Sequence, residues 1–256
     1  MTNLDAELRA ATEAARAAGI EVARMRAEGL RYGHKDGHEL VSEADVRANE
    51  MLHAALAIPF PDIGWLSEEH VDTDVRLTRE RVWVVDPIDG TREFLQGIPE
   101  YAVSVGLVIG GKPALGVVYN PATDELFTAN CLGAVERPPA GIPRRIEVLV
   151  GRAEHQWDDL PPLPPGARTT GVGSVAYRLA LLASGRGHAV LSGYGRSEWD
   201  VAAGVALCLA AGLRVTDVLG APIPFNQPEP FVRGLLMAEP GLHEHFSRSF
   251  AQLRER

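Results

Sequence analysis

An apolar stretch that runs directly into two aspartates limits the architecture of this chain more than any other part of its sequence. Residues 82–85 read Val-Trp-Val-Val, and the next six are Asp86, Pro87, Ile88, Asp89, Gly90 and Thr91. The apolar residues predict a strand, and the proline and glycine predict that the chain turns after it. The aspartates lie three residues apart in this turn, so both carboxylates and the carbonyl between them can meet at one point.

Such a set of oxygen donors suits a hard divalent cation. Mg²⁺ prefers oxygen ligands and commonly binds carboxylates together with water and substrate phosphate. The N–H groups of Gly90 and Thr91 and the Thr91 hydroxyl would lie beside the metal, where they can bind a phosphate oxygen. An isolated Asp-x-x-Asp pair has a simpler explanation, because aspartates in turns often hydrogen-bond their own backbone. The assignment therefore depends on the rest of the chain.

The composition argues against several classes of function. The chain has 25 Lys and Arg against 34 Asp and Glu, a formal net charge of −9, and its basic residues are scattered. A nucleic acid polymer is therefore not an expected partner. The sequence has neither a secretory apolar stretch nor a run of ~18 uncharged apolar residues, so we expect no membrane association and a cytoplasmic location. Cys131 and Cys208 form no Cys-x-x-Cys pair and are expected to stay reduced.

Hydrophobic periodicity divides the chain into a helical start, an antiparallel meander and a second mixed region. The expected helices are 4–29, 45–56, 174–184, 201–211 and 241–253, and the expected strands are 63–66, 82–86, 101–109, 114–119, 125–129, 169–170, 188–191 and 231–238. The proline-rich segment 138–166 predicts a boundary. We place it between an N-terminal α+β subdomain, 1–140, and a C-terminal α/β subdomain, 141–256. Helices and strands segregate into layers, which indicates an α+β or layered α/β fold.

Two strings imitate nucleotide-binding motifs. The stretch from Gly106 to Lys112 has the spacing G-x-x-x-x-G-K, but Pro113 follows where a Ser or Thr must bind magnesium, so we expect a hairpin turn at Gly110-Gly111. The string that starts at Gly171 resembles a dinucleotide fingerprint, but it comes late in the chain and has no acidic residue about 20 positions on. Neither string supports a nucleotide-binding fold of those types.

Three acidic segments accompany the Asp86 turn in a distinctive order. The string Asp-Pro-Ile-Asp-Gly-Thr, with Arg-Glu-Phe after it, resembles the metal-binding loop of the inositol monophosphatase superfamily. The other segments that are similar to motifs of that family are Lys35-Asp36-Gly37 with Val41–Asp45, Gly64–Glu69 with its Glu-Glu pair, and Ser197–Gly204 with its Trp-Asp pair. The similarity runs from about Lys35 to Met237 and is weakest in 131–170.

The resemblance implies a layered α/β/α/β/α sandwich of the inositol monophosphatase/fructose-1,6-bisphosphatase type. It also implies a phosphatase that uses two or three Mg²⁺ ions to hydrolyse the phosphate monoester of a small soluble metabolite. By motif, the metal ligands are Glu68, Asp86, the Ile88 carbonyl, Asp89 and Asp200. The catalytic residues are Glu68 and Thr91, which would orient and deprotonate water, and Asp45, which would close a weaker magnesium position. Gly90 and Thr91 would bind the phosphate.

Each additional segment also has a plainer explanation. Ser42-x-x-Asp45 and Ser197-x-x-Asp200 fit the helix capping box, and Glu68-Glu69 alone would be a solvated turn. The occurrence of all of them in the family's order favours metal binding.

The residues around these motifs favour one branch of the family. The continuation Arg92-Glu93-Phe94 resembles the 3′(2′),5′-bisphosphate nucleotidases, and Gly193 stands where inositol enzymes have a glutamate that binds sugar hydroxyls. Arg196, or Arg178, suits a second phosphate, although both also fit ordinary surface arginines. Ser174, at a predicted helix start, is a further candidate for binding an anionic substrate.

These features favour adenosine 3′,5′-bisphosphate as the substrate. The alternative within the family is inositol 1-phosphate or another sugar phosphate, and an alternative of another class is a noncatalytic metal or nucleotide sensor. The family resemblance further implies a homodimer and sensitivity to lithium.

Overall fold

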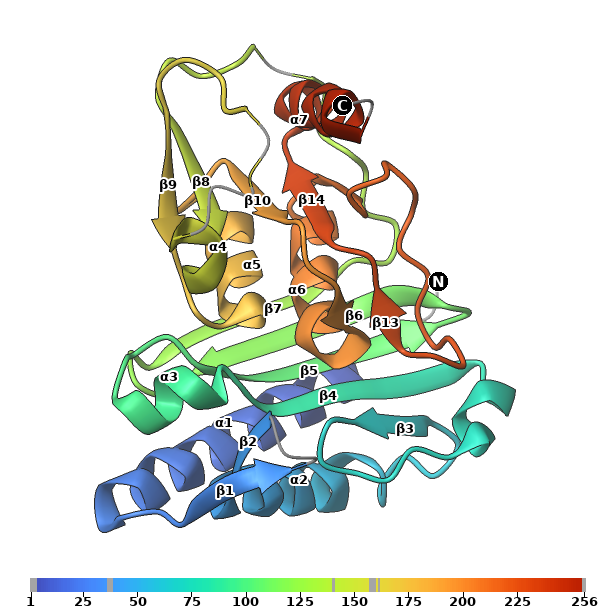
Figure 1. Cartoon of the computed structure of the whole chain (residues 1–256). Helices are drawn as coiled ribbons and strands as arrows, with labels where there is room; N and C mark the ends of the chain where they lie inside the picture. The colour runs from blue at the N-terminus through green and yellow to red at the C-terminus, as the bar shows by residue number, and fades with distance from the viewer. Residues whose placement is uncertain (1–3, 36–38, 140, 157–159, 161, 255–256) are drawn as a thin grey trace.

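The computed structural model describes residues 4–35, 39–139, 141–156, 160 and 162–254. In Figure 1 these residues form layers in the order helices, sheet, helices, sheet and C-terminal helix. Helices α1 and α2 pack on the first sheet, α5 and α6 lie between the two sheets, and α7 covers the outer face of the second sheet. The predicted α/β/α/β/α sandwich is therefore confirmed.

The outer helical layer forms because small apolar side chains recur on one face of each helix. Helix α1 (Asp5–Glu28) buries a row of alanines and Val22, and α2 (Glu43–Leu56) buries Ala48 and Leu52. The periodicity predicted both helices. It did not predict the short hairpin of β1 (Tyr32–Lys35) and β2 (Glu39–Ser42) between them. The Asp36-Gly37 part of the family segment lies outside the described residues.

The first sheet has the strand order β3-β4-β5-β6-β7. Its strands are β3 (Gly64–Ser67), β4 (Arg81–Asp89), β5 (Ala102–Ile109), β6 (Lys112–Asn120) and β7 (Glu125–Asn130). Strand β3 runs parallel to β4, and the other neighbours pair in antiparallel fashion. The predicted meander and the turn at Gly110-Gly111 are confirmed.

The prediction that the chain turns at Asp86-Pro87 is wrong. Strand β4 continues through Pro87 to Asp89, with a shift in its pairing to β5 between the two aspartates. A bulge tolerates proline because the missing N–H falls where no ladder bond is needed. The chain turns at Gly90, whose φ of 92° is left-handed, and then enters helix α3 (Thr91–Gln96), which the sequence analysis did not predict.

The second sheet has the order β12-β14-β10-β8-β9. Its strands are β8 (Ile146–Val150), β9 (Ala167–Gly171), β10 (Ala189–Ser192), β12 (Arg214–Thr216) and β14 (Leu235–Ala238). The predicted strand 231–238 is in fact two strands, because Gly234 has a φ of 75° and redirects the chain. Its first part, β13 (Phe231–Val232), pairs with β11 (Arg196–Ser197) instead.

The remaining elements surround these sheets. They are the 3₁₀ helix η1 (Asp74–Thr78) and the helices α4 (Arg152–Gln156), α5 (Val175–Ala183), α6 (Glu198–Ala210) and α7 (Pro240–Arg254). In the part of the chain that the structure describes, no helix is both long and apolar enough to traverse a lipid bilayer.

Candidate active site

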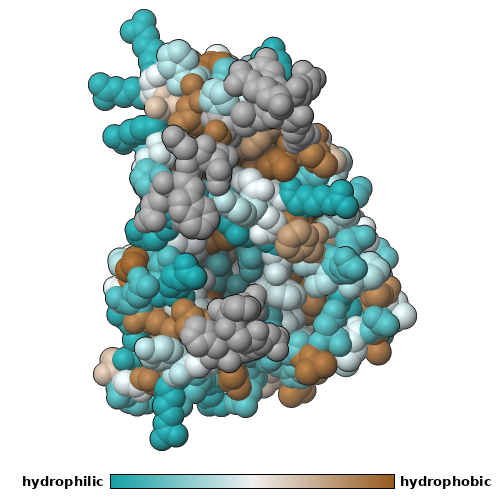
Figure 2. Space-filling model, in the orientation of Figure 1, coloured by the Kyte–Doolittle hydropathy of each residue, from teal (hydrophilic) through white to brown (hydrophobic). Residues whose placement is uncertain are grey.

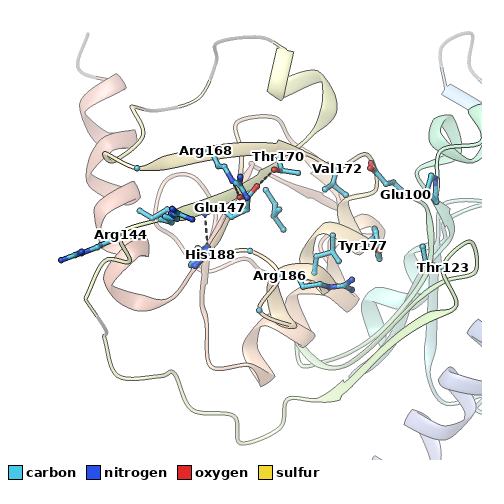
Figure 3. Close-up of a pocket in the computed structure, with 18 residues that line it drawn as sticks. Glu100, Thr123, Arg144, Glu147, Arg168, Thr170, Val172, Tyr177, Arg186 and His188 are labelled. Atoms are coloured by element: carbon cyan, nitrogen blue, oxygen red, sulfur yellow. Dashed lines mark hydrogen bonds and ion pairs between the residues drawn. The ribbon is translucent and has the colours of Figure 1, made fainter.

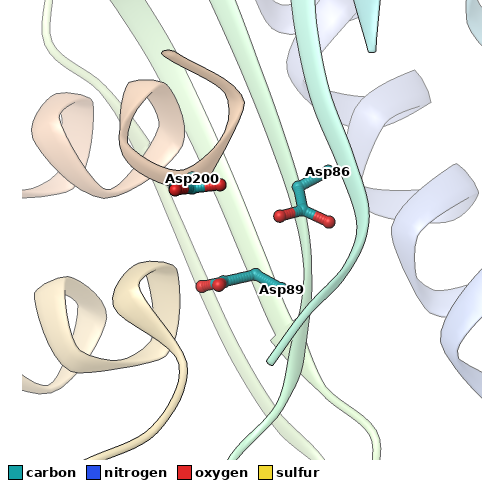
Figure 4. A group of neighbouring side chains, drawn as sticks. All are labelled: Asp86, Asp89 and Asp200. Carbon is teal, nitrogen blue, oxygen red and sulfur yellow. The ribbon is translucent and has the colours of Figure 1, made fainter. Parts of the chain in front are cut away.

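Three aspartates from two distant segments meet between the first sheet and the middle helices. Ligand oxygens of Asp86, Asp89 and Asp200 all lie within 4.8 Å of one another. Figure 4 shows the first two on β4 and the third near the start of α6, with the three carboxylates facing a common space. Asp86 and Asp89 are buried, and Asp200 is half-buried. The structure thus brings together three of the predicted metal ligands.

The irregularity in β4 explains how two residues three apart reach one side of the sheet. In a regular strand, positions i and i+3 face opposite ways. The register shift between Asp86 and Asp89 removes this alternation. The Ile88 N–H donates to Asp86 Oδ1 at 3.0 Å, which fixes the bulge.

Asp89 and Asp200 are each held by donors at the start of a helix. Asp89 Oδ2 accepts a hydrogen bond from the Ser174 hydroxyl at 2.6 Å and another from the Ala176 N–H. Ser174 is fully buried and is also the N-cap of α5, so it lies behind Asp89. Asp200 accepts the Ser197 N–H at 3.2 Å within a capping box. Asp200 therefore caps α6 and also belongs to the aspartate cluster.

Asp45 and Thr91 connect α2 to the metal loop. Asp45 Oδ2 accepts the Ser42 N–H at 2.8 Å and the Ser42 hydroxyl at 2.6 Å, so the predicted capping box is present. Thr91 Oγ1 lies 3.2 Å from Asp45 Oδ1 and 3.1 Å from the Ile88 carbonyl oxygen, and its proton can go to either acceptor. Asp45 thus caps α2 and contacts Thr91, while its predicted role at a weaker magnesium position stays a prediction.

The electrostatics of the cluster call for a cation. Burial, with the charges of Glu68 and the neighbouring aspartates, raises the pKa of Asp86 and Asp200 well above the usual range. Burial also raises the pKa of Asp89 to about 6, against the effect of its hydrogen bonds, and raises the pKa of Asp45 to about 6. Carboxylates so close together are stable at neutral pH when a cation offsets their charge. The donors are all hard oxygens, which fits Mg²⁺.

Beside the acidic cluster lie two basic residues, one buried and one half-buried. Arg178 is fully buried, and its Nη1 lies 3.5 Å from Glu154 Oε2, while Arg196 Nη2 lies 3.6 Å from the same oxygen. Glu154 also accepts the Ser192 hydroxyl at 2.6 Å. Burial lowers the pKa of Arg178 to about 10, and its Nε and Nη2 make no hydrogen bond with the described residues. One carboxylate therefore faces two guanidinium groups.

Sequence reasoning missed Glu154, although a signal for it existed. The stretch Ile146–Val150, apolar except for Glu147, resembles a strand, and Gly151 and then this acid follow it. The surrounding prolines and the weak family similarity hid the strand. In the structure the Gly151 N–H donates to Glu154 Oε2 at 2.9 Å, which turns the acid back against the end of β8.

An open cavity of about 650 Å³ lies over the acidic cluster. Its lining includes Glu68, Gly90, Thr91, Arg196 and Asp200, so residues of every predicted role reach it. Figure 2, in the orientation of Figure 1, shows a largely hydrophilic hollow between the upper and lower parts of the molecule. Tyr194 and Arg152, which the sequence analysis did not name, complete the wall.

A larger cavity, of about 1160 Å³, lies elsewhere, against β8, β9 and α5 (Figure 3). Two of its arginines are engaged in ion pairs. Arg168 contacts Glu147, and Arg186 lies 2.6 Å from Glu125. The only cluster of metal-binding side chains among the described residues is the aspartate group. We therefore place the candidate active site in the cavity beside the aspartates, although its volume is the smaller of the two.

Comparison with known proteins gives a consistent assignment. The model of the inositol monophosphatase family matches residues 3–255. The chain is 32% identical over 217 residues to the 3′(2′),5′-bisphosphate nucleotidase CysQ of Salmonella typhimurium, covering 80% of this chain and 87% of that protein. It is 35% identical over 228 residues to the inositol-1-monophosphatase of Mesorhizobium japonicum, covering 81% of this chain and 84% of that protein.

The structural comparison agrees. The extragenic suppressor protein suhB of Bartonella henselae has a TM-score of 0.78 and 27% identity, covering 96% of this chain and 98% of that chain. Because the family match spans nearly the whole sequence and both relatives are phosphatases by name, the chain belongs to the inositol monophosphatase family and is a metal-dependent hydrolase of phosphoric monoesters.

Proposed function

We propose that the acidic site binds two or three Mg²⁺ ions and hydrolyses the phosphate monoester of a small soluble metabolite. The ligands are Glu68, Asp86, the Ile88 carbonyl, Asp89 and Asp200, with Asp45 at a weaker position. The observation that carries this proposal is the meeting of three aspartate carboxylates within 4.8 Å beside an open cavity. When bound, the ions would neutralise phosphoryl oxygens, acidify water and stabilise the leaving oxygen.

The residues of the chain have separate tasks in this reaction. Thr91 and Glu68 orient the attacking water and take its proton, and Asp45 accepts the Thr91 hydroxyl at 3.2 Å. The N–H groups of Gly90 and Thr91 bind phosphate oxygens. Gly90 has to be glycine, because its φ is 92° and a Cβ would lie 2.9 Å from the Glu100 carbonyl oxygen. Ser174 contributes by fixing Asp89, with which it bonds at 2.6 Å.

For the substrate we favour a 3′(2′),5′-bisphosphate nucleotide, adenosine 3′,5′-bisphosphate in particular. A second phosphate needs cations close to the metals, and Arg196 lines the cavity next to Asp200. Arg196 and Arg178 both lie within 3.6 Å of Glu154, so two guanidinium groups stand beside one glutamate at this point. Gly193 has no side chain that could bind sugar hydroxyls. Inositol 1-phosphate or another sugar phosphate is the alternative, in line with the 35% identical relative.

Phosphate release tests this proposal directly. Purified protein should release phosphate from adenosine 3′,5′-bisphosphate only when Mg²⁺ is present, and with a higher kcat/KM than from inositol 1-phosphate. Equal or better use of inositol 1-phosphate would reverse the order of substrates. A protein that binds Mg²⁺ and nucleotide but releases no phosphate would instead be the noncatalytic sensor. A homodimer and inhibition by lithium stay predictions from the family resemblance, and a cytoplasmic location stays a prediction from the sequence.

A further inference from the structure

The turn at residues 225–228 is held by a buried acid of helix α6. Glu198, the first residue of the helix, is fully buried. Its two carboxylate oxygens accept the N–H groups of Asn226 at 2.7 Å and Gln227 at 2.9 Å. The N–H of Glu198 itself donates to the Pro230 carbonyl at 2.9 Å. The start of α6 is thus fixed to the turn by two hydrogen bonds, and by a third to Pro230 just beyond it.

The same turn is held from the opposite side by a buried arginine. Arg76, only 2% exposed, donates from Nη1 to Asn226 Oδ1 at 2.8 Å and from Nη2 to the Gln227 carbonyl at 2.9 Å. Its remaining donors bind Asp72 at 2.7 Å. Asn226 Nδ2 returns a bond of 3.2 Å to the Arg76 carbonyl. In Figure 1, the red-orange segment before β13 reaches down to the teal segment that follows β3.

These bonds hold Asn226 in an unusual backbone conformation. Its φ is 57°, in the left-handed region, which residues other than glycine adopt at a cost in free energy. Asparagine tolerates this region best among such residues, and here its backbone N–H and both side-chain polar atoms are bonded. The turn therefore has one well-defined shape.

The position of this turn network (Arg76, Glu198, Asn226 and Gln227) relates it to the metal site. Glu198 precedes Asp200 by two residues in the first turn of α6. Arg76 follows Glu68 in the connection after β3, and its Cα lies within 3.3 Å of where a Cβ on Gly64 of that strand would be. The network therefore joins the segment that follows Glu68 to the start of α6, which carries Asp200, and both of these acids line the cavity.

We infer that Glu198 and Arg76 are positioning residues, which set the distance between the Glu68 segment and Asp200 through the turn at 225–228. This inference rests on the proposed metal ligands. Buried charges bonded in this way contribute little net stability compared with apolar packing, because their desolvation offsets much of the gain. They instead fix the positions of the groups to which they bond. Metal sites require ligands held within about 0.5 Å of the productive geometry, which a network of buried hydrogen bonds can provide.

The test measures binding of Mn²⁺ to the substrate-free protein by electron paramagnetic resonance. Arg76→Met and Glu198→Gln each remove bonds to the turn while keeping side-chain size, so each should raise the Kd for Mn²⁺ at least ten-fold in folded protein. In the double variant the effects should not add, because both side chains hold the same turn. Asn226→Gly, which keeps the left-handed backbone and loses only the side-chain bonds, should also weaken binding.

Two controls separate positioning from stability and from the ligand assignment. His243→Gln removes a buried partner of Thr216 far from the site, and it should lower the melting temperature without changing the Kd. Asp89→Asn should abolish tight binding. If Asp89→Asn abolishes tight binding while Arg76→Met and Asn226→Gly bind Mn²⁺ like the wild type, the positioning role is overturned and the ligand set stands. If Asp89→Asn binds like the wild type, the ligand set itself is overturned.

Discussion

Asp89 is buried among like charges, and this placement lowers the stability of the folded protein when no metal is bound. Its carboxylate lies within 4.8 Å of those of Asp86 and Asp200, and the repulsion is opposed by the donors from Ser174 and Ala176 and by the charges of Arg178 and Arg196. Mutual repulsion of buried carboxylates destabilises the folded state at neutral pH. Residues that act in catalysis commonly reduce stability in this way.

We predict that Asp89→Asn stabilises the metal-free protein while abolishing its activity. The amide keeps an oxygen for Ser174 and Ala176 and removes one negative charge, so the free energy of unfolding in EDTA should rise by about 1–3 kcal/mol. Added Mg²⁺ should raise the melting temperature of the wild type and leave the variant unchanged. Asp124→Asn makes the same change at an exposed aspartate, and it should neither stabilise the metal-free protein nor abolish activity. A lower melting temperature for Asp89→Asn in EDTA would contradict the prediction.

For single residues, the family motifs gave most of what could be predicted from the sequence. Asp45 and Asp200 each fitted helix capping and metal binding, and the structure shows the capping while leaving each carboxylate close to the other site residues. The two explanations do not exclude each other, because a carboxylate has a second oxygen to offer. Tyr194 could not be predicted, because its place in the cavity wall depends on which segments the fold brings together. Glu154 had a local signal in the strand-like stretch before it, but that signal did not indicate that the acid reaches the cavity.

Helix α6 presents Asp200 at the right depth because two strand glycines let it approach the first sheet. Gly106 and Gly116 face each other across β5 and β6. A Cβ on Gly116 would lie 2.2 Å from the Ala203 carbonyl oxygen, and one on Gly106 would lie 3.0 Å from the Ala203 nitrogen. Gly106 therefore serves helix packing, which explains why its apparent phosphate-loop spacing has no nucleotide-binding meaning.

We predict that Gly116→Ala shifts α6 away from the sheet. The contact is with backbone, so no side chain can rotate to relieve it, and the overpacking should cost about 1–3 kcal/mol of folding free energy. Because Asp200 moves with the helix, the Mg²⁺ concentration for half-maximal activity should rise as well. Gly141→Ala, where a Cβ would meet nothing within 4 Å, is the matched control. Unchanged metal dependence in a destabilised Gly116→Ala protein would show that α6 does not set the position of Asp200.

Element predictions succeeded where the hydrophobic pattern was long and failed where pairing depends on distant partners. The strands β5 and β6 and the helices α1 and α6 have extended apolar patterns. The two-residue strands β11 and β13 exist only because they pair with each other, and β8 lies within a proline-rich segment. The wrong turn at Pro87 has the same origin, because a bulge is a property of the strand pair and not of one strand.

For the whole molecule, the layer order was predictable from the family resemblance, while the division into halves stays a prediction. One apolar cluster contains only residues up to Tyr119, and another only residues from Ile146 on. Two further clusters take residues from both halves, through contacts of α5 and α6 with the first sheet. Residue 140, at the proposed boundary, lies outside the described residues. The site sits where the halves share these helices, so its integrity depends on the whole chain folding together.

The outermost layer gives the molecule an acid-sensitive contact far from the site. His243 of α7 is only 3% exposed, and its Nε2 lies 2.9 Å from Thr216 Oγ1 next to the second sheet. Burial, and then the charge of Arg214, lower the pKa of His243 to about 4, while the carboxylates of Glu136 and Glu244 act in the opposite direction. The histidine is therefore neutral in the folded protein at neutral pH.

We predict that this histidine lowers the stability of the wild type as the pH falls from about 6.5 to about 4. In that interval the unfolded chain, with an ordinary histidine pKa of about 6.5, binds a proton that the folded protein does not, so unfolding becomes more favourable. The loss should reach about 3 kcal/mol at the acid end, since each unit of difference in pKa corresponds to about 1.4 kcal/mol.

Urea unfolding at several pH values should show a free energy of unfolding that depends less on pH for His243→Gln than for the wild type. His155→Gln, a change at an exposed histidine, should keep the wild-type slope. Parallel curves for His243→Gln and the wild type would mean that acid destabilises the fold through other groups, with the packing of α7 contributing nothing to it.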